Sequence, residues 1–271
     1  MNKVEVIFIE KEFSTSGHSP FLATCNDAKK YVVKHDRGKE LCIINEFLAC
    51  FLLEHFNLPF SNYALVNVDD LVIQNSSIIS PKNKKLSYYK SLCFGSEFLK
   101  NAVDINNFGL DYGKSFFDKL DNPLDILRIA LFDIWVGNDD RKPTNYNMLL
   151  VENSKKYKAV PIDHSFIFET LSHSFLNPDF FEGKINDHLL EANFGYLVKK
   201  QFEINERFIE SEENYFLVSL AACQKHFSNF ASKLQNQFHF SDKDITKISL
   251  FLFDETRNRK VFEEYKFHLK N

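Results

Sequence analysis

The segment GNDDRKPTNYNMLLV, residues 137 to 151, decides how the rest of the chain is interpreted. It places acidic, amide and cationic side chains and one proline between two apolar runs. Such residues are also common in an ordinary polar turn between a helix and a strand. A solvated turn and a catalytic loop therefore both remain open when this segment is considered alone.

The spacing inside the segment favours the catalytic loop. Asp140 is followed by Lys142 two residues later and by Asn145 five residues later, as in a kinase catalytic loop. There the aspartate accepts or orients the proton of the attacking hydroxyl, the lysine neutralises charge on the transferred phosphoryl group, and the asparagine oxygen binds magnesium. We therefore expect Asp140 and Lys142 to be catalytic and Asn145 to be a metal ligand.

The neighbours of the segment predict the elements that such a loop needs. Residues 124 to 136 are apolar on nearly every face, which predicts a buried helix after Pro123. Residues 146 to 151 and 157 to 162 predict two short strands, and Asp163 ends the second strand. An aspartate there would supply a second oxygen ligand for the cation; an aspartate that caps a turn is the alternative.

The first 98 residues predict a small sheet with one helix. A helical apolar stripe covers residues 43 to 56, and a polar loop covers residues 75 to 85. The expected strands are residues 4–13, 21–25, 31–35, 63–68 and 89–94, with the second and third forming a hairpin. After residue 98 the pattern is mainly helical, with amphipathic helices over 213–230 and 244–253.

Lys34 and Glu46 are the charged residues of interest in this first part. Lys34 lies in a β-branched strand, where a lysine either faces solvent or has an anionic partner. Glu46 lies in the otherwise apolar helix that follows. We expect Lys34 to contact Glu46 or a bound phosphate; an edge-strand lysine and a solvent-facing glutamate are the alternative.

A loop rich in hydroxyl groups lies between the first two predicted strands. It contains Ser14, Thr15, Ser16, Gly17, His18 and Ser19. Its hydroxyl and backbone N–H groups would suit phosphates, although one glycine is also compatible with an ordinary hairpin loop. Phosphorylation here would add about −1.5 to −2 charge units where ATP phosphates are expected, and should inhibit.

The composition excludes several classes of protein. The chain has 271 residues, of which 44% are hydrophobic, enough for one large domain or two modest ones. Its net charge of −4 argues against generic duplex binding, so we expect no direct contact with nucleic acid. Its five cysteines form no Cys-x-x-Cys pair, and no apolar run of about 18 residues occurs. We expect a cytoplasmic protein without a structural zinc site or a membrane segment.

Taken together, these residues resemble the HipA-like branch of the protein-kinase superfold and, more distantly, the phosphatidylinositol kinases. The resemblance covers about residues 3 to 168. It is carried by GHSP at 17–20, YVVK at 31–34, NE at 45–46, CFGSE at 93–97, Asp140-Arg141 with Asn145, and Ile162-Asp163-His164. It implies an α+β, two-lobed fold, with a small β-rich N-lobe containing one helix in residues 1–98 and a larger, mostly helical C-lobe in residues 99–271.

The resemblance also implies an activity. ATP and Mg2+ would be the cofactors, and the γ-phosphate would pass to a serine or threonine hydroxyl of a protein. Members of the family are toxins that act on aminoacyl-tRNA synthetases and are neutralised by a DNA-binding antitoxin, so a synthetase substrate and an antitoxin partner are implied. The implied ATP-binding residues are Ser16, Gly17, His18, Ser19, Lys34, Glu46, Phe94 and Glu97, with residues 94 to 97 as the hinge against adenine; the implied autophosphorylation residues are Ser14, Thr15, Ser16 and Ser19.

Three features depart from the family pattern. Lys142 stands where many relatives have histidine, Ser165 stands where a glycine would make the segment pliable, and the chain begins directly with the first kinase strand. Two other functions stay open. One is a pseudokinase-like module that binds a nucleotide or a partner without catalysis. The other is a metal-dependent nuclease built on Asp139, Asp140 and Asp163, against which the lack of a basic surface argues.

Overall fold

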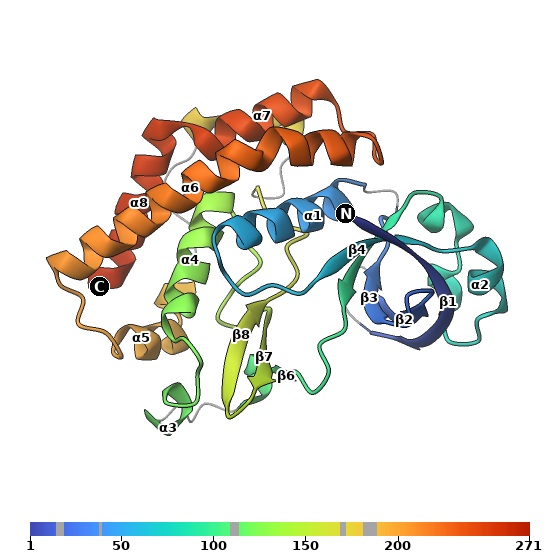
Figure 1. Cartoon of the computed structure of the whole chain (residues 1–271), viewed down its shortest axis with the longest axis horizontal. Helices are drawn as coiled ribbons and strands as arrows, with labels where there is room; N and C mark the ends of the chain where they lie inside the picture. The colour runs from blue at the N-terminus through green and yellow to red at the C-terminus, as the bar shows by residue number, and fades with distance from the viewer. Residues whose placement is uncertain (15–18, 38–39, 109–113, 169–171, 181–188) are drawn as a thin grey trace. The chain divides into compact units, whose positions relative to one another are not determined.

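The computed structural model describes residues 1–14, 19–37, 40–108, 114–168, 172–180 and 189–271 (Figure 1). The chain divides into two compact units. Unit 1 consists of Met1–Cys50, Ser61–Lys100 and Ser232–Phe240, and unit 2 of Phe51–Phe60, Asn101–Ala231 and Ser241–Asn271. Each unit has its own sheet, and the mixture of helices and strands agrees with the predicted α+β class.

Five strands form the sheet of unit 1. They are β1 (Asn2–Glu12), β2 (Phe21–Cys25), β3 (Lys30–Lys34), β4 (Tyr63–Asn67) and β5 (Cys93–Glu97). The sheet closes into a small barrel in the order β1-β2-β3-β5-β4, and a parallel pairing of β1 with β4 closes it (Figure 1). The predicted hairpin and the strands around residues 4–13 and 63–68 are confirmed, whereas the closure was not predicted.

The close packing of β4 and β5 explains one glycine of the CFGSE motif. Gly95 lies opposite Ala64 in the antiparallel register of these strands. A Cβ atom added to Gly95 would lie 2.4 Å from Cγ2 of Val66, a distance that real side chains do not reach. Any larger residue would therefore push the two strands apart.

Two predictions for unit 1 were wrong in detail. The strand expected over residues 89–94 is β5, which begins only at Cys93, because Leu86–Tyr89 forms a 3-10 turn and the hydroxyl of Tyr89 donates to Asn83 O at 2.9 Å. A short helix, α2 (Asp70–Asn75), precedes and enters the expected polar loop. Its start is set by Asp69, whose carboxylate accepts from Leu71 N at 2.7 Å and caps the helix.

The helix predicted over residues 43–56 is α1 (Glu40–His55). Its residues up to Cys50 belong to unit 1. There Phe47 is fully buried, with its ring centroid 5.0 Å from that of Phe94 and 5.7 Å from that of Phe238. The aromatic face of the helix therefore fixes its rotation against β5, and this rotation decides where Glu46 points.

Unit 2 contains the predicted buried helix and the hairpin after it. The helix is α4 (Leu124–Val136), and the strands are β7 (Met148–Asn153) and β8 (Lys156–Pro161). A two-residue strand, β6 (Val103–Asp104), adds to β7 and makes a three-stranded sheet in the order β6-β7-β8 (Figure 1). Both predictions are confirmed; β6 is too short to give a periodic signal.

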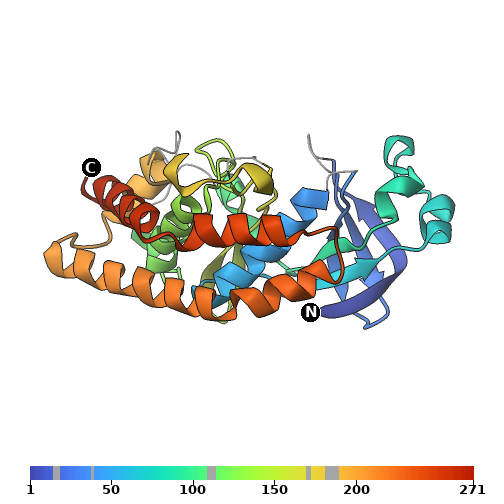
Figure 2. The ribbon, with the colours of Figure 1, turned by 90° about the horizontal axis from the view of Figure 1, so that it is seen from above.

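The other elements that the structure describes in unit 2 are helices and short helical turns. Its other helices are α3 (Lys114–Phe117), α5 (Asn193–Lys199), α6 (Glu206–Gln235), of which the last four residues belong to unit 1, α7 (Asp242–Phe253) and α8 (Glu255–Lys270). The helices predicted over 213–230 and 244–253 lie within α6 and α7. Asp254 separates α7 from α8 and caps α8 by accepting from Arg257 N at 2.7 Å. The orange-to-red helices α6, α7 and α8 form the C-terminal part of the chain (Figure 2). Short 3-10 turns occur in unit 1 at Pro81–Asn83 and Leu86–Tyr89, and in unit 2 at Ile105–Phe108, His173–Phe175, Pro178–Phe180 and Leu189–Glu191.

Aromatic side chains fill the core of unit 2. Phe56 stacks on Trp135 with a centroid distance of 4.8 Å, and Phe132 meets Phe56 edge-on at 5.5 Å. Aromatic packing of this kind is the structural use of these buried phenylalanines. Within the described residues, no helix combines the length and the apolar character needed to cross a membrane.

Candidate active site

In unit 1 the predicted contact between Lys34 and Glu46 is present. Nζ of Lys34, at the end of β3, lies 2.5 Å from Oε1 of Glu46 on α1, and the two side chains are 12% and 3% exposed. A pair that is so well shielded from water is strongly coupled, because removing one partner would leave the other charge buried. The contact is confirmed, while the binding of ATP phosphates by Lys34 stays a prediction.

Only the two ends of the hydroxyl loop are described. Ser14 is exposed, and Ser19 is 2% exposed; Thr15, Ser16, Gly17 and His18 lie outside the described residues. The hydroxyl of Ser19 accepts a hydrogen bond from Nη2 of Arg37 at 3.2 Å. The same guanidinium nitrogen donates to Oδ1 of Asn83 at 2.7 Å. Of the two described hydroxyls, Ser14 is therefore the one that a phosphate donor can approach.

The residues predicted as the adenine hinge lie on β5. Phe94 is 2% exposed because its ring packs against Phe47. The carboxylate of Glu97 is 2.8 Å from Nζ of Lys29 and is partly exposed. These side chains serve the packing and surface charge of unit 1, and their contact with adenine stays a prediction.

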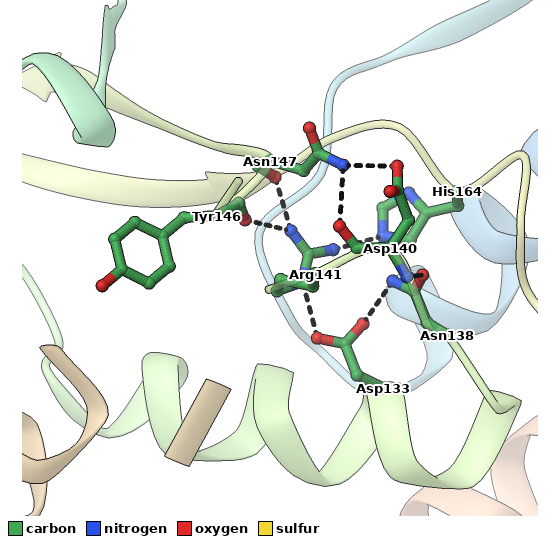
Figure 3. A network of polar contacts seen from close by, with 7 residues as sticks. All are labelled: Asp133, Asn138, Asp140, Arg141, Tyr146, Asn147 and His164. Atoms are coloured by element: carbon green, nitrogen blue, oxygen red, sulfur yellow. Dashed lines mark hydrogen bonds and ion pairs between the residues drawn. The ribbon is translucent and has the colours of Figure 1, made fainter. Parts of the chain in front are cut away.

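In unit 2 the loop after α4 begins at a glycine. Gly137 has a φ of 62° and ends the helix in the left-handed conformation, which glycine adopts without steric cost. The side chain of Asn138 then donates to Asp133 on α4 at 2.8 Å, and its oxygen accepts from Asp140 N at 3.3 Å. The chain is thus turned back over the end of α4 before it reaches Asp140 (Figure 3).

Arg141 is the centre of the polar network beneath the loop (Figure 3). The residue is 2% exposed, and its Nε donates to the Asp133 carboxylate at 2.5 Å. Its Nη1 donates to the backbone oxygens of Tyr146 and Asn147, at 2.7 Å and 2.5 Å. One guanidinium therefore joins helix α4 to the end of the loop, and its rigid planar shape fixes the geometry of both.

His164 is the fourth partner of this network. Its Nε2 lies 3.1 Å from Nη2 of Arg141, and the side chain is 2% exposed. Because an arginine has only donors, His164 must accept through Nε2, which makes the ring neutral with its proton on Nδ1. The residue next to Asp163 is therefore tied to the residue next to Asp140.

Asp140 and Asp163 are brought together by this arrangement. Asp163 follows β8 and has a φ of 58°, a left-handed conformation that aspartate tolerates better than most residues. Burial raises the pKa of the Asp140 carboxyl above its usual value and the charge of Asp163 raises it further, whereas the hydrogen bond from Asn147 lowers it. Burial also raises the pKa of Asp139. The loop thus concentrates negative charge, as a cation site requires.

Lys142 and Asn145 form a tight turn within the loop. Lys142 N donates to Asn145 O at 3.0 Å, and Asn145 N donates to Lys142 O at 2.9 Å. Burial raises the pKa values of Asp139 and Asp140, and the positive charge of Lys142 partly opposes this effect at both carboxyls. The catalytic role of Lys142 and the metal-binding role of Asn145 remain predictions.

The oxygen atoms of this loop fit a hard cation. Carboxylate and amide oxygens, together with oxygens of a ligand, are what Mg2+ prefers. In the part of the chain that the structure describes, no three His, Cys, Asp or Glu side chains are arranged to hold a metal ion. A cation bound at Asp140 and Asp163 would therefore need further oxygens from an amide and from a phosphate.

Sequence reasoning missed the supporting residues of the site. Asp133 had a visible signal, because it is a charged residue within the apolar run LFDIWV. Asn138 and Asn147 had none, since asparagines are expected in any turn. Arg141 and His164 were noticed only as part of the family resemblance, and their pairing joins residues 23 positions apart.

The chain is similar to proteins of known structure and to one family of proteins. The structure matches that of the proinflammatory kinase CtkA of Helicobacter pylori with a TM-score of 0.55 and 15% sequence identity, over 99% of this chain and 98% of that one. The Golgi casein kinase with Mn/ADP bound matches with a TM-score of 0.47 and 13% identity, over 97% of this chain and 74% of that one. A search of the curated proteins found no match. The model of the HipA-like kinase family matches residues 6–259, and the chain therefore belongs to the HipA-like kinase family.

Proposed function

We propose that this kinase-family protein uses ATP and Mg2+ to transfer the γ-phosphate to a serine or threonine hydroxyl of a protein. The observation that carries the proposal is that Asp140, on the loop fixed by Arg141, is close enough to Asp163, which follows β8, to feel its charge. Phosphoryl transfer depends mainly on positioning and charge neutralisation. The acidic loop held by Arg141 would supply the positioning. A bound cation together with Lys142 would supply the charge neutralisation.

Asp140 would act on the acceptor hydroxyl. Its carboxylate accepts the hydroxyl proton while the acceptor oxygen bonds to the γ-phosphorus and the bond from that phosphorus to the β-phosphate oxygen breaks. The products are the phosphorylated hydroxyl and ADP. Lys142 would stabilise the charge on the transferred group, and its exposed side chain is free to reorient toward it.

Lys34 and Glu46 would serve the nucleotide in unit 1. Glu46 holds the Lys34 ammonium group in one position, and a lysine so oriented suits the phosphates of ATP. Asp163 and Asn145 would hold Mg2+, which neutralises phosphate charge when bound. Ser16, Gly17, His18 and Ser19 would cover the phosphates, and Phe94 and Glu97 would lie at the adenine.

Family membership supports three finer proposals. The acceptor would be a component of translation such as an aminoacyl-tRNA synthetase, the protein would act as a cytoplasmic toxin, and an antitoxin partner would restrain it. Autophosphorylation in the hydroxyl loop would switch the activity off. Among the described hydroxyls, the exposed Ser14 suits this role better than the buried Ser19.

The test is transfer of label from γ-labelled ATP to proteins of a host lysate. We expect the wild type to label one or a few proteins, with its own band reporting autophosphorylation. Asp140→Ala and Asp163→Ala should each remove the label, with a loss of at least about 10²-fold, while both variants stay folded by circular dichroism. Full activity in either variant would overturn the proposal.

The same assay separates the alternative functions. Magnesium-dependent nucleotide binding without transfer to any protein would identify a pseudokinase-like binding module. Labelling of a small molecule or a lipid would keep the phosphotransferase and change the acceptor class. A protein without nucleotide affinity would bring back the nuclease hypothesis.

A further inference from the structure

Asn147 stands outside the Asp-x-Lys-x-x-Asn pattern, yet its side-chain amide contacts the Asp140 carboxylate (Figure 3). Its Nδ2 donates to Oδ2 of Asp140 at 3.1 Å. No described hydrogen bond joins the side chain of Asn145 to Asp140; the backbone of Asn145 is used instead in the turn with Lys142. The pattern and the tertiary contact therefore point to two different asparagines.

The backbone of Asn147 is held from two sides. Its carbonyl oxygen accepts from Nη1 of Arg141 at 2.5 Å and from Ile162 N at 2.8 Å. Its φ of 43° is left-handed, a conformation in which asparagine is enriched. Because Ile162 directly precedes Asp163, the same residue connects the loop of Asp140 to the turn of Asp163. These contacts fix the backbone of Asn147, from which its side-chain amide extends toward Asp140.

We propose that Asn147 is a positioning residue for the phosphotransfer reaction: its amide group holds Asp140 so that one carboxylate oxygen is occupied and the other faces the acceptor hydroxyl. The inference rests on the proposed function, since it assigns Asp140 as the group that accepts the proton. Oδ2 of Asp140 is engaged by the amide, and Oδ1 has no hydrogen bond among the described residues. A carboxylate held in this way cannot rotate away from its substrate without breaking the contact.

A purely structural role for Asn147 is the competing explanation, and the backbone contacts make it testable. Asn147→Gly removes the amide but keeps a residue that adopts positive φ freely. Asn147→Asp keeps the shape and one oxygen but replaces the donor by a carboxylate, which cannot donate to Asp140. The matched control is Asn101→Gly, because Asn101 is an exposed asparagine in the same unit with a φ of 60°.

The experiment measures kcat and KM for ATP, together with the melting temperature and the shift of that temperature by ADP with Mg2+. We expect Asn147→Gly to lower kcat by about 10²-fold, with KM, melting temperature and ligand shift equal to those of Asn101→Gly. Asn147→Asp should not recover the activity. Asn145→Ala, if Asn145 binds the cation, should instead raise the Mg2+ concentration needed for half-maximal rate.

Two results would overturn the inference while the proposed function stands. One is an Asn147→Gly variant whose kcat matches that of Asn101→Gly. The other is a lower kcat in Asn147→Gly accompanied by a lost ligand shift or a raised KM, which would make Asn147 part of the nucleotide or cation site. A wild type without any phosphoryl transfer is distinct from both, and it overturns the proposed function and this inference together.

Discussion

Arg141 and Asp133 form a salt bridge in which both side chains are only 1% exposed. A buried charge is tolerated only when its partners remain in place. Without them, the free energy lost by removing the ion from water exceeds what a single hydrogen bond contributes. Arg141 also donates to two backbone oxygens of the loop. At the scale of single residues, the shape of the candidate site therefore depends on one guanidinium group.

We expect Arg141→Ala to lower the free energy of unfolding by about 3–5 kcal/mol, because it leaves the Asp133 carboxylate buried without its cation. Urea unfolding followed by circular dichroism measures this change. The matched control is Arg259→Ala, which removes an arginine whose ion pair with Glu255 is exposed, at 81% and 89%. The control should lose no more than about 0.5 kcal/mol. Equal losses in the two variants would show that the network does not stabilise the fold.

The 3-10 turn His173–Phe175 is an element whose stability should depend on pH. It packs against α7, and the His173 ring lies edge-on to Phe168 with a centroid distance of 5.7 Å. Burial lowers the pKa of His173 from 6.5 to about 4, against an opposing effect of Asp244 on α7. The folded turn therefore keeps the ring neutral at a pH where an unfolded chain would protonate it.

The sign of the pH effect follows from proton binding. Between pH 6.5 and about 4 the unfolded state binds the proton more strongly than the folded state, so the free energy of unfolding falls as the pH falls. The loss attributable to His173 is at most about 3 kcal/mol, from the size of the shift. We expect His173→Gln to show a shallower dependence over this range. The free energy of unfolding of the wild type and of His173→Gln is measured across this range, each relative to its own value at pH 7.5. Identical slopes of this free energy against pH in the two proteins would contradict the prediction.

At the scale of the whole molecule, each compact unit carries a different part of the proposed chemistry. Unit 1 presents the Lys34–Glu46 pair, and unit 2 presents Asp140 after α4 and Asp163 after β8. Nucleotide binding can be measured without any acceptor substrate, because a ligand that binds only the folded state stabilises it. Stabilisation by ligand therefore tests the nucleotide site separately from catalysis.

We expect ADP with Mg2+, at a hundred times its Kd, to raise the free energy of unfolding by about 2.7 kcal/mol. Lys34→Ala should remove this gain, because no ammonium group then meets the phosphates. Lys30→Ala is the matched control, since Lys30 lies on the same strand but pairs with Glu10 at the surface. Each gain is measured by thermal denaturation relative to the ligand-free form of the same variant. A gain in Lys34→Ala equal to that in Lys30→Ala would exclude Lys34 as a phosphate ligand.

Several parts of this protein were determined by local sequence. Two short runs rich in apolar residues, on either side of a polar turn, set the hairpin of β2 and β3, and a run that is apolar on nearly every face set the buried helix α4. These patterns are local because periodicity reflects which side of one element is buried. The positions of Asp140 after the buried helix and of Asp163 after a strand were also predictable. Lys34 was predicted within a strand, and the structure places it at the end of β3.

The tertiary structure decided what joins residues that are far apart in the chain. Closure of the barrel pairs β1 with β4, and the choice of Asn147 over Asn145 as the partner of Asp140 depends on where Arg141 and Ile162 hold the backbone. A spacing motif records distance along the chain, whereas hydrogen bonds depend on distance in space. The sequence by itself therefore determined most of the elements and the candidate acids, and only the folded network decided which amide donates to the Asp140 carboxylate.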